Sequence, residues 1–433
     1  RIFERDAALA RRFTRVEVEE PAPEAALEIL AGIAPEYEKH HAVPITQEAL
    51  EAAVDMSVRY VRERQLPDKA IAVVDQAAAR ARRRGRAVVD VEAVAEVVSE
   101  QASIPLERLM MRDGEALVAL DQHLARRVVG QPDAIAAIAG ALRKGAAGFR
   151  GARPLGTFLF LGPTGVGKTE MAKAISELLF PGGEPTRFDM SELSESHGVA
   201  RLLGAPPGYV GHEDGGQLTE AVRKRPYQLI LLDEIEKAHM DVLLALLPLL
   251  DEGRLTDGRG RTVDFTNTVV VMTSNLGADA TPRSTRARIG FGAGPGDAEM
   301  DGQREASLAA ARAALPPELW NRIDEPLFFE PLDRADVASI AERMVATAAA
   351  LMLREHGIAV SADRSAIESL IAAGGYDPKL GARPMRRTVG RLIEAPLARA
   401  VLAGEFSSGD VVLLRGEGTQ IVVERGSAID AAE

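Results

Sequence analysis

The sequence predicts an α/β protein in which a large domain with a parallel β-sheet is joined to two small, mainly helical domains. The first observation is a set of short runs of large and β-branched residues, Phe158–Leu161, Leu229–Leu232 and Thr268–Met272. Runs that are apolar on both faces are typical of central strands in a parallel sheet covered by helices. The second observation is that residues 22–103, and the chain after Pro331, have helical periodicity instead.

Weaker signals complete the large domain and the C-terminal part. Arg187–Asp189 and Leu327–Phe329 are weaker strand candidates. Residues 281–305 are rich in Gly, Pro, Arg and Asp, so we expect a long mobile loop there. Two short strands are expected near the end of the chain, Asp410–Leu414 and Gln420–Glu424, with turn residues between them.

The first helical region has an apolar stripe that predicts one buried helix face. The stripe consists of Leu50, Val54, Val58 and Val61. A second helix is expected over residues 69–83 and a third begins at Val91, with Val88–Asp90 as an extended stretch or a cap. A basic run is interpreted mainly as a solvated helix end, with a partner-docking patch as the alternative. This run contains Arg80, Arg82, Arg83, Arg84 and Arg86.

Composition limits the classes of function. The chain has 433 residues and a net charge of −12, which argues against nucleic acid as the main partner because phosphate binding needs clustered Lys and Arg. Cysteine is absent, and the adjacent His40 and His41 cannot form an i, i+4 metal pair, so neither disulfides nor zinc are expected. No apolar run approaches the roughly 20 residues that span a bilayer, and no signal peptide is visible. We therefore expect a cytoplasmic protein without membrane segments and, because it begins with Arg1, a fragment of a longer one.

The strongest motif is a glycine-rich phosphate-binding loop. It follows the strand Phe158–Leu161 and precedes a helix, which is the context that the GxxxxGK[ST] pattern requires. The glycines allow backbone N–H groups to surround phosphates, Lys168 neutralises the β- and γ-phosphates, and the Thr169 hydroxyl binds Mg²⁺. The predicted nucleotide-binding residues of this segment are Gly162, Pro163, Thr164, Gly165, Val166, Gly167, Lys168, Thr169 and Glu170.

Two further strands end in residues suited to ATP hydrolysis. The apolar strand Leu229–Leu232 is followed by Asp233, expected to hold Mg²⁺ through water, and Glu234, expected to orient and polarise the attacking water. Asn275 follows the next strand, and ligands bind at the carboxyl ends of strands in open α/β sheets. Asn275 is therefore expected near the γ-phosphate or the attacking water, although a capping Asn is the alternative.

With these motifs in place, nearly the whole chain resembles the Clp ATPases, a family of AAA+ unfoldases and disaggregases. The resemblance implies a parallel five-stranded sheet in the P-loop domain and ATP with Mg²⁺ as cofactors. The most specific matching stretches are Gly204–Gly211, Leu232–His239, Asn321–Asp324 and Gly381–Pro384.

The resemblance also implies the domain organisation. The chain is similar to the end of a first ATPase module followed by a complete second module. Arg11 and Arg12 match the first module's finger pair, and their role without that module's P-loop is left open. The expected segments are a remnant of the first large domain (1–21), its helical small domain (22–103), a linker (104–124), the second large domain (125–330) and the C-terminal small domain (331–433).

Several site residues follow only from the resemblance. Tyr209, with Val210, would be the pore loop that grips an extended substrate. Arg322 would be the arginine finger that completes a neighbouring subunit's site, and Arg383 the sensor arginine of the small domain. Val129 lies in a segment similar to the one that lines the adenine pocket.

A tripeptide in the expected long loop, Ile289-Gly290-Phe291, resembles the motif by which some Clp ATPases dock on the ClpP peptidase. Disaggregases of the family carry a long coiled-coil insertion in the first small domain, and no heptad segment intervenes here between Ala79 and Val88. The favoured function is therefore a hexameric, ATP-dependent unfoldase that feeds a ClpP-type peptidase. A peptidase-independent remodeller of aggregates or secretion sheaths, a nucleotide-gated scaffold and a nucleic-acid motor remain as alternatives in that order.

Overall fold

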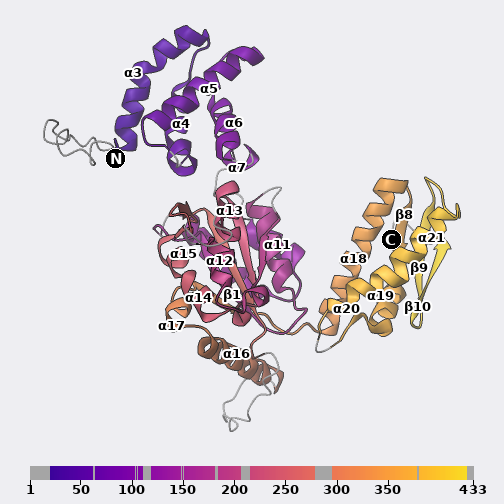
Figure 1. Ribbon diagram of the computed structural model, residues 1–433. Helices are drawn as coiled ribbons and strands as arrows, with labels where there is room; N and C mark the ends of the chain where they lie inside the picture. The colour runs from indigo at the N-terminus through magenta and orange to yellow at the C-terminus, as the bar shows by residue number, and fades with distance from the viewer. Residues whose placement is uncertain are drawn as a thin grey trace. The chain divides into compact units, whose positions relative to one another are not determined.

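The computed structural model describes residues 20–61, 64–102, 104, 106–110, 119–147, 149, 151–180, 184–205, 215–277, 295–377 and 380–426. The chain forms two compact units, Arg1–Arg112 and Asp113–Glu433 (Figure 1). Within the described ranges, no helix is long and apolar enough to cross a membrane.

The first unit is helical, as predicted. Thr46 caps its second helix, which begins at Gln47, by accepting a hydrogen bond from the Ala49 N–H at 3.1 Å. The preceding residue, Ile45, forms a parallel bridge with Val89. Asp90 caps the fourth helix through the N–H of Ala93, at 2.9 Å. Of the predicted segment 88–90, Val89 therefore lies in an extended bridge and Asp90 is the cap. The helices are α3 (Pro23–His41), α4 (Gln47–Tyr60), α5 (Asp68–Arg84), α6 (Val91–Ala102) and α7 (Leu106–Met110).

The predicted buried face of α4 is partly wrong. Leu50 and Val54 are buried, but Val58 is 37% exposed and Val61 lies beyond the last residue of the helix. The buried face of α4 instead includes small residues, which are not detected when only large apolar side chains are considered. The buried residues of α4 are Ala49, Leu50, Ala53, Val54 and Ser57.

The basic run at the end of α5 is more than a solvated helix end. Arg80 pairs with Glu100 at 2.6 Å, and Arg84 and Arg86 both pair with Glu96, so three of the five guanidinium groups contact acidic residues of α6. Gly85 ends α5 in the left-handed conformation.

The second unit contains the predicted five-stranded parallel sheet, with strand order β2-β3-β6-β1-β7. All five strand predictions are confirmed, and the carboxyl ends of β1, β3 and β6 lie at one edge because these neighbours are parallel and in register. The strands are β1 (Gly156–Leu161), β2 (Thr186–Asp189), β3 (Gln228–Asp233), β6 (Thr268–Ser274) and β7 (Glu325–Phe328).

Helices pack on this sheet. Between β3 and β6 in the sequence, the chain also forms a separate two-stranded antiparallel hairpin, β4 (Arg254–Thr256) with β5 (Thr262–Asp264). The hairpin was not predicted, because three-residue strands are too short to show periodicity. The helices are α9 (Leu120–Arg127), α10 (Pro132–Ala146), α11 (Lys168–Leu179), α12 (Gly198–Leu203), α13 (Gln217–Lys224), α14 (Met240–Ala245), α15 (Leu247–Glu252), α16 (Pro295–Ala314) and α17 (Pro317–Trp320), with short turns η1 (Met190–Leu193) and η2 (Ile235–Lys237).

Two boundaries differ from those expected. The expected mobile loop, 281–305, includes the first half of α16, whose helix formation is favoured by the alanines that follow. The expected linker boundary at residue 124 lies inside α9, where Leu120 and Leu124 are fully buried.

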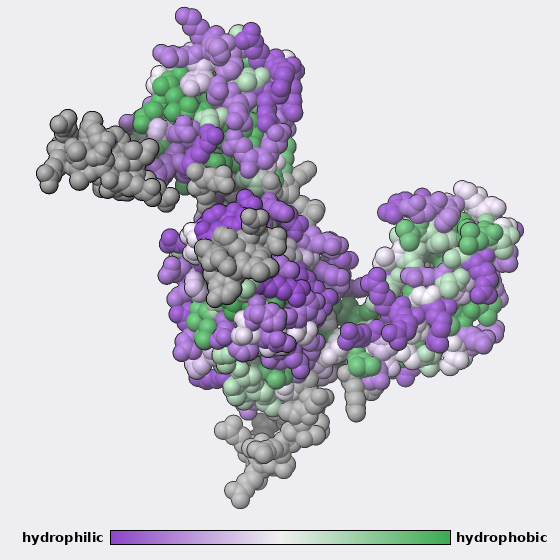
Figure 2. Space-filling view, in the orientation of Figure 1, coloured by the Kyte–Doolittle hydropathy of each residue, from purple (hydrophilic) through white to green (hydrophobic). Residues whose placement is uncertain are grey.

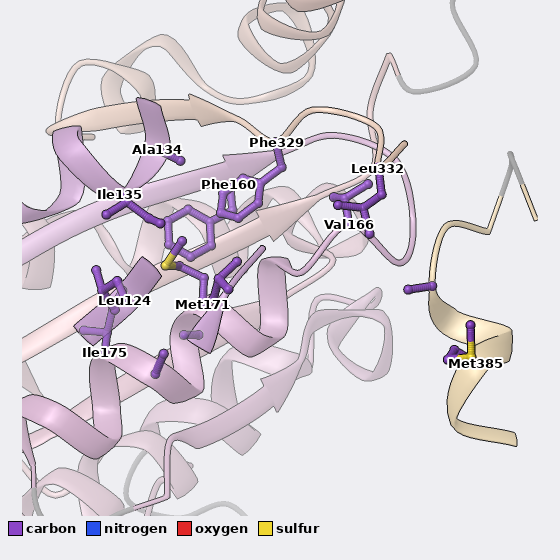
Figure 3. Packing of buried hydrophobic residues seen from close by; sticks show 14 of the residues in the cluster. Leu124, Ala134, Ile135, Phe160, Val166, Met171, Ile175, Phe329, Leu332 and Met385 are labelled. Carbon is purple, nitrogen blue, oxygen red and sulfur yellow. The ribbon is translucent and has the colours of Figure 1, made fainter. Parts of the chain in front are cut away.

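The side chains of β1 contribute to two buried hydrophobic clusters, and Phe160 belongs to the one that includes helix α11. Phe160 of β1 packs against Phe329 with ring centroids 4.9 Å apart, and Met171 and Ile175 of α11 are fully buried beside them (Figure 3). Because α11 begins directly at the end of the P-loop, this packing fixes the position of the loop.

The C-terminal part combines helices with a three-stranded sheet of order β10-β9-β8. The two predicted strands are confirmed and β8 was missed. A capping box between Asp333 and Asp336 begins its long first helix. The elements are α18 (Arg334–His356), β8 (Ala359–Ala362), α19 (Arg364–Leu370), η3 (Ile371–Gly375), α20 (Arg383–Val389), η4 (Gly390–Glu394), α21 (Ala395–Leu402), β9 (Val411–Glu417) and β10 (Gln420–Arg425). Hydrophobic side chains also reach the surface here (Figure 2), and the large exposed ones include Leu351, Leu353, Leu380 and Leu402.

Candidate nucleotide site

The loop between β1 and α11 has the backbone geometry of a phosphate cradle. Gly162, Gly165 and Gly167 have φ values of 134°, 82° and 105°, which side chains rarely allow. A Cβ atom at Gly162 would lie 2.5 Å from the Phe329 carbonyl oxygen, and one at Gly165 would collide with the carbonyl oxygen of Leu380. Glycine is therefore required for this loop to pass so close to its neighbours.

The N-terminus of α11 supplies the donors that an anion needs. The Met171 N–H bonds to the Gly167 carbonyl at 2.8 Å, and the N–H groups of the three preceding residues, in the first helical turn, have no carbonyl partner within the helix. Thr169 is the second residue of this helix and is half-buried. Glu170 pairs at its carboxylate with Arg127, 3.5 Å away.

The ammonium group of Lys168 lies inside this loop. It donates to the carbonyl oxygens of Gly162 and Pro163 and to the amide oxygen of Asn275, the last at 2.7 Å. Burial lowers the pKa of Lys168 to about 8, while the nearby carboxylates of Glu236, Asp233 and Glu234 act in the opposite direction.

The two acidic residues after β3 are held by neighbouring strands. Asp233, 14% exposed, pairs with Arg187 of β2 at 2.6 Å and accepts a hydrogen bond from the Thr273 hydroxyl. Glu234 follows with φ 56° and ψ 53°, the left-handed conformation, and its N–H donates to Thr273 Oγ1 at 3.1 Å. Asp233 and Glu234 are therefore held against the end of β6.

Glu236 is a site carboxylate to which our sequence analysis gave no role. Its Oε1 accepts a hydrogen bond from the Asn275 N–H at 3.2 Å, and its Oε2 is buried without a hydrogen-bond partner. Its position three residues after Asp233, within the matching stretch Leu232–His239, is a signal in the sequence that could have placed it here.

Gln131, the last residue of the segment that resembles an adenine-pocket lining, connects the loop to more distant parts of the chain. It is 3% exposed, donates to the Glu330 carbonyl at 2.9 Å and accepts from the Glu330 N–H at 3.0 Å. Its amide also lies 3.4 Å from the Val166 carbonyl. Val128, beside the half-buried Val129, lies 3.3 Å from where a Cβ of Gly167 would stand. The segment predicted to line the adenine pocket thus borders the P-loop.

The two predicted arginines lie in different surroundings. Arg322 donates to the Glu318 carbonyl at 2.6 Å and pairs with Asp251 at 2.8 Å. Arg383 begins α20 with an exposed side chain. Its backbone nitrogen lies 3.2 Å from where a Cβ of Gly165 would stand, so the backbone around Arg383 borders the P-loop.

The remaining predicted functional segments lie outside the described residues. These are the pore-loop pair Tyr209 and Val210, the tripeptide Ile289-Gly290-Phe291, and the arginines Arg11 and Arg12.

These residues fit a nucleotide with Mg²⁺. The glycine cradle and the start of α11 suit phosphates, and the Lys168 ammonium group lies inside the same loop, where it would attract a negatively charged ligand. Within the described part of the chain, no group of three or more His, Asp or Glu side chains could hold a metal by itself. A magnesium ion held by Thr169 and Asp233 would therefore depend on phosphate oxygens for further ligands.

Three protein families match the chain in sequence order. The AAA lid domain matches residues 22–121, the AAA domain (Cdc48 subfamily) matches residues 153–326, and the C-terminal D2-small domain of ClpB protein matches residues 332–414.

Individual proteins are similar over nearly the whole chain. The chaperone protein ClpB of Pseudomonas putida is 39% identical over 544 aligned positions, which cover 97% of this chain and 62% of ClpB. ClpC of Staphylococcus epidermidis, an ATP-dependent Clp protease ATP-binding subunit, is 38% identical, with 96% of this chain and 58% of ClpC covered. A closed-state reconstruction of Hsp104 with ATPγS and FITC casein has a TM-score of 0.75 and 34% identity, covering 98% of this chain and 72% of that one. The chain spans about three-fifths of the length of these two curated relatives.

Proposed function

Because the chain belongs to the Clp family of AAA+ ATPases, we propose that it uses the hydrolysis of Mg²⁺-bound ATP to unfold protein substrates. The observation that carries the catalytic part is the hydrogen bond from Lys168 Nζ to Asn275 Oδ1, which joins the P-loop to the end of β6. Asp233 and Glu234 lie at the same edge of the sheet, because β3 is the neighbour of β6.

Each group has a role in this proposal. The loop and the first turn of α11 bind the phosphates, and Lys168 and Asn275 lie beside the γ-phosphate. Glu234 orients the attacking water and accepts its proton. Bound magnesium would draw negative charge from the phosphates, and Thr169 and Asp233 would hold it. Positioning and charge neutralisation of this kind supply most of the catalysis in phosphoryl transfer.

Work on substrates requires a ring in this proposal. Arg322 completes the site of the next subunit in a homo-hexamer, Arg383 couples the nucleotide to the small domain, and Tyr209 with Val210 grips the substrate chain in the pore. Support comes from the similarity to ClpB, ClpC and the Hsp104 structure with casein. The cytoplasmic location stays a prediction.

The proposal also includes a peptidase that receives the unfolded substrate. α5 ends at Arg84 and α6 begins at Val91, so no coiled-coil insertion separates them. About 420 residues of this chain align over 544 positions of the ClpB comparison, so more than 100 aligned ClpB positions have no counterpart here. We therefore favour an unfoldase that docks on a ClpP-type peptidase through Ile289-Gly290-Phe291. The similarity to ClpB and Hsp104 keeps the peptidase-independent remodeller as the second candidate.

The deciding experiment uses the full-length protein with Glu234→Gln, saturated with ATP so that the ring is held together. Binding to ClpP that is lost when Ile289 and Phe291 are both changed to Ala supports the protease motor. An intact hexamer that does not bind ClpP supports the peptidase-independent remodeller. If Glu234→Gln hydrolyses ATP at the wild-type rate, the role of Glu234 is wrong.

A further inference from the structure

Thr273, near the end of β6, contacts both acidic residues that follow β3. Its hydroxyl oxygen accepts a hydrogen bond from the Glu234 N–H at 3.1 Å, and the same hydroxyl donates to Asp233 Oδ1. A hydroxyl has one proton to donate and lone pairs to accept with, so it can make both bonds at once. The side chain is 2% exposed, which keeps water from replacing either bond.

The sheet register explains why Thr273 occupies this place. β3 and β6 are parallel, and their last paired residues are Leu232 and Met272. The next residues along the two strands are Asp233 and Thr273, which therefore lie side by side where the pairing ends. A residue at this position can bond the acidic segment only if its side chain is short and polar.

The backbone of Glu234 needs such a contact. Within the described residues, only Ala42 and Glu234 have a positive φ without being glycine, and Ala42 simply ends helix α3. A glutamate persists in this conformation only where its surroundings fix it, and such residues gather at functional sites.

We propose that Thr273 is a positioning residue that fixes the Glu234 backbone and so directs the Glu234 carboxylate toward the attacking water. The inference rests on the proposed role of Glu234. A second bond joins the same two segments, from the Asn275 N–H to Glu236 Oε1, so the acidic turn is held to the end of β6 at two points. Thr273 acts through Glu234 and Asp233, while Asn275 faces Lys168 directly.

The test compares three variants of the full-length protein. Thr273→Val keeps the shape and loses both bonds, and Thr273→Ser keeps the hydroxyl. Thr268→Val is the matched control, because Thr268 is a fully buried residue of the same strand whose hydroxyl donates to the Phe265 carbonyl at 2.7 Å, away from the site.

We expect Thr273→Val to lower kcat for ATP about 10- to 100-fold, the usual effect of removing a group that orients a functional residue. The KM for ATP and the Kd for a fluorescent ATP analogue should stay within about twofold of wild type, because the phosphate-binding groups are untouched. Thr273→Ser should recover most of kcat, and Thr268→Val should keep it.

A second readout needs no nucleotide. Hydrogen–deuterium exchange in the peptide that contains Glu234 should be faster in Thr273→Val than in Thr273→Ser or Thr268→Val. Three results would each overturn the proposal: wild-type kcat in Thr273→Val, an equal loss of kcat in Thr268→Val, or unchanged exchange. If the wild-type protein lacks ATPase activity, the proposed function fails, while the exchange result still reports on Thr273.

Discussion

Lys168 Nζ lies 2.7 Å from Asn275 Oδ1, so the lysine of the glycine-rich loop and the residue that follows β6 are in direct contact. The same ammonium group also donates to two carbonyl oxygens of its own loop, which satisfies all three of its protons. Phosphate oxygens at Lys168 would compete with these partners, and Asn275 is the partner that lies outside the loop, directly after β6.

The first prediction separates binding from chemistry at this contact. Lys168→Ala should abolish measurable binding of a fluorescent ATP analogue, because it removes the positive charge of the cradle. Asn275→Ala should keep nucleotide binding within several-fold of wild type and lower kcat by about 100-fold, comparable to the loss of one oriented donor at a site of developing charge. Equal losses of binding in both variants would contradict the assignment of Asn275 to the chemical step.

The second prediction concerns the glycine of the loop that faces Leu380. Gly165→Ala should destabilise the second unit by at least about 1 kcal/mol and weaken nucleotide binding, because φ is 82° and the added Cβ collides with the Leu380 carbonyl oxygen. Gly140 is the matched control: it lies within helix α10, and a Cβ there meets nothing within 4 Å. Gly140→Ala should raise stability by about 0.5–1 kcal/mol. Thermal unfolding of both variants decides the matter, and equal melting temperatures would contradict the prediction.

The sequence was sufficient to predict the central strands of the large sheet and the P-loop because each has a strong local pattern. Phe158–Leu161 is apolar throughout, and the glycine-rich loop follows it immediately. Contacts between residues far apart in the sequence were not predicted. Gln131 bonds to Glu330, 199 residues away, and nothing near either residue in the sequence indicates the contact. The sequence assigned no role to Thr273, because its two bonds depend on the register of β3 with β6.

The third prediction tests whether Arg322 acts on a neighbouring subunit. In one chain Arg322 pairs with Asp251 and donates to the Glu318 carbonyl, so its guanidinium is held by residues of its own subunit. The Arg322 side chain is 27% exposed. Arg322→Ala should bind ATP normally and lose about 10³-fold or more in kcat, as for other arginine fingers.

A more decisive measurement is the ATPase rate of rings that contain both Arg322→Ala and Lys168→Ala subunits. Arg322→Ala subunits retain Lys168, and Lys168→Ala subunits retain Arg322, so mixed rings contain some interfaces with both groups intact. Mixtures should therefore recover a fraction of the wild-type ATPase rate that neither variant shows alone. Mixtures as inactive as the separate variants, with hexamers confirmed by size, would place the action of Arg322 within its own subunit.

The fourth prediction uses the ion-pair network that holds α13 to the β4–β5 hairpin. Glu220 bonds to Arg223 and to Arg261, each at 2.7 Å, and Arg261 also pairs with the buried Asp257 at 2.6 Å. Hydrogen bonds from Arg223 and then Arg261 lower the pKa of Glu220 from 4.5 to about 2. A carboxylate whose pKa is lowered by folding stabilises the protein above its unfolded pKa, and this contribution is lost as the pH falls from about 4.5 toward 2.

Glu220→Gln should therefore melt below the wild-type protein at pH 7, and the difference should be unchanged down to about pH 5 and then narrow as the wild-type carboxylate is protonated. Glu195→Gln is the control. The Glu195 side chain is 76% exposed and pairs with the equally exposed His197, so the melting temperature of this variant should stay near wild type at every pH. Thermal unfolding of the three proteins at pH 7, 5 and 4 makes the comparison. A Glu220→Gln difference that grows below pH 5 would contradict the prediction, because it would mean that folding raises the pKa of Glu220.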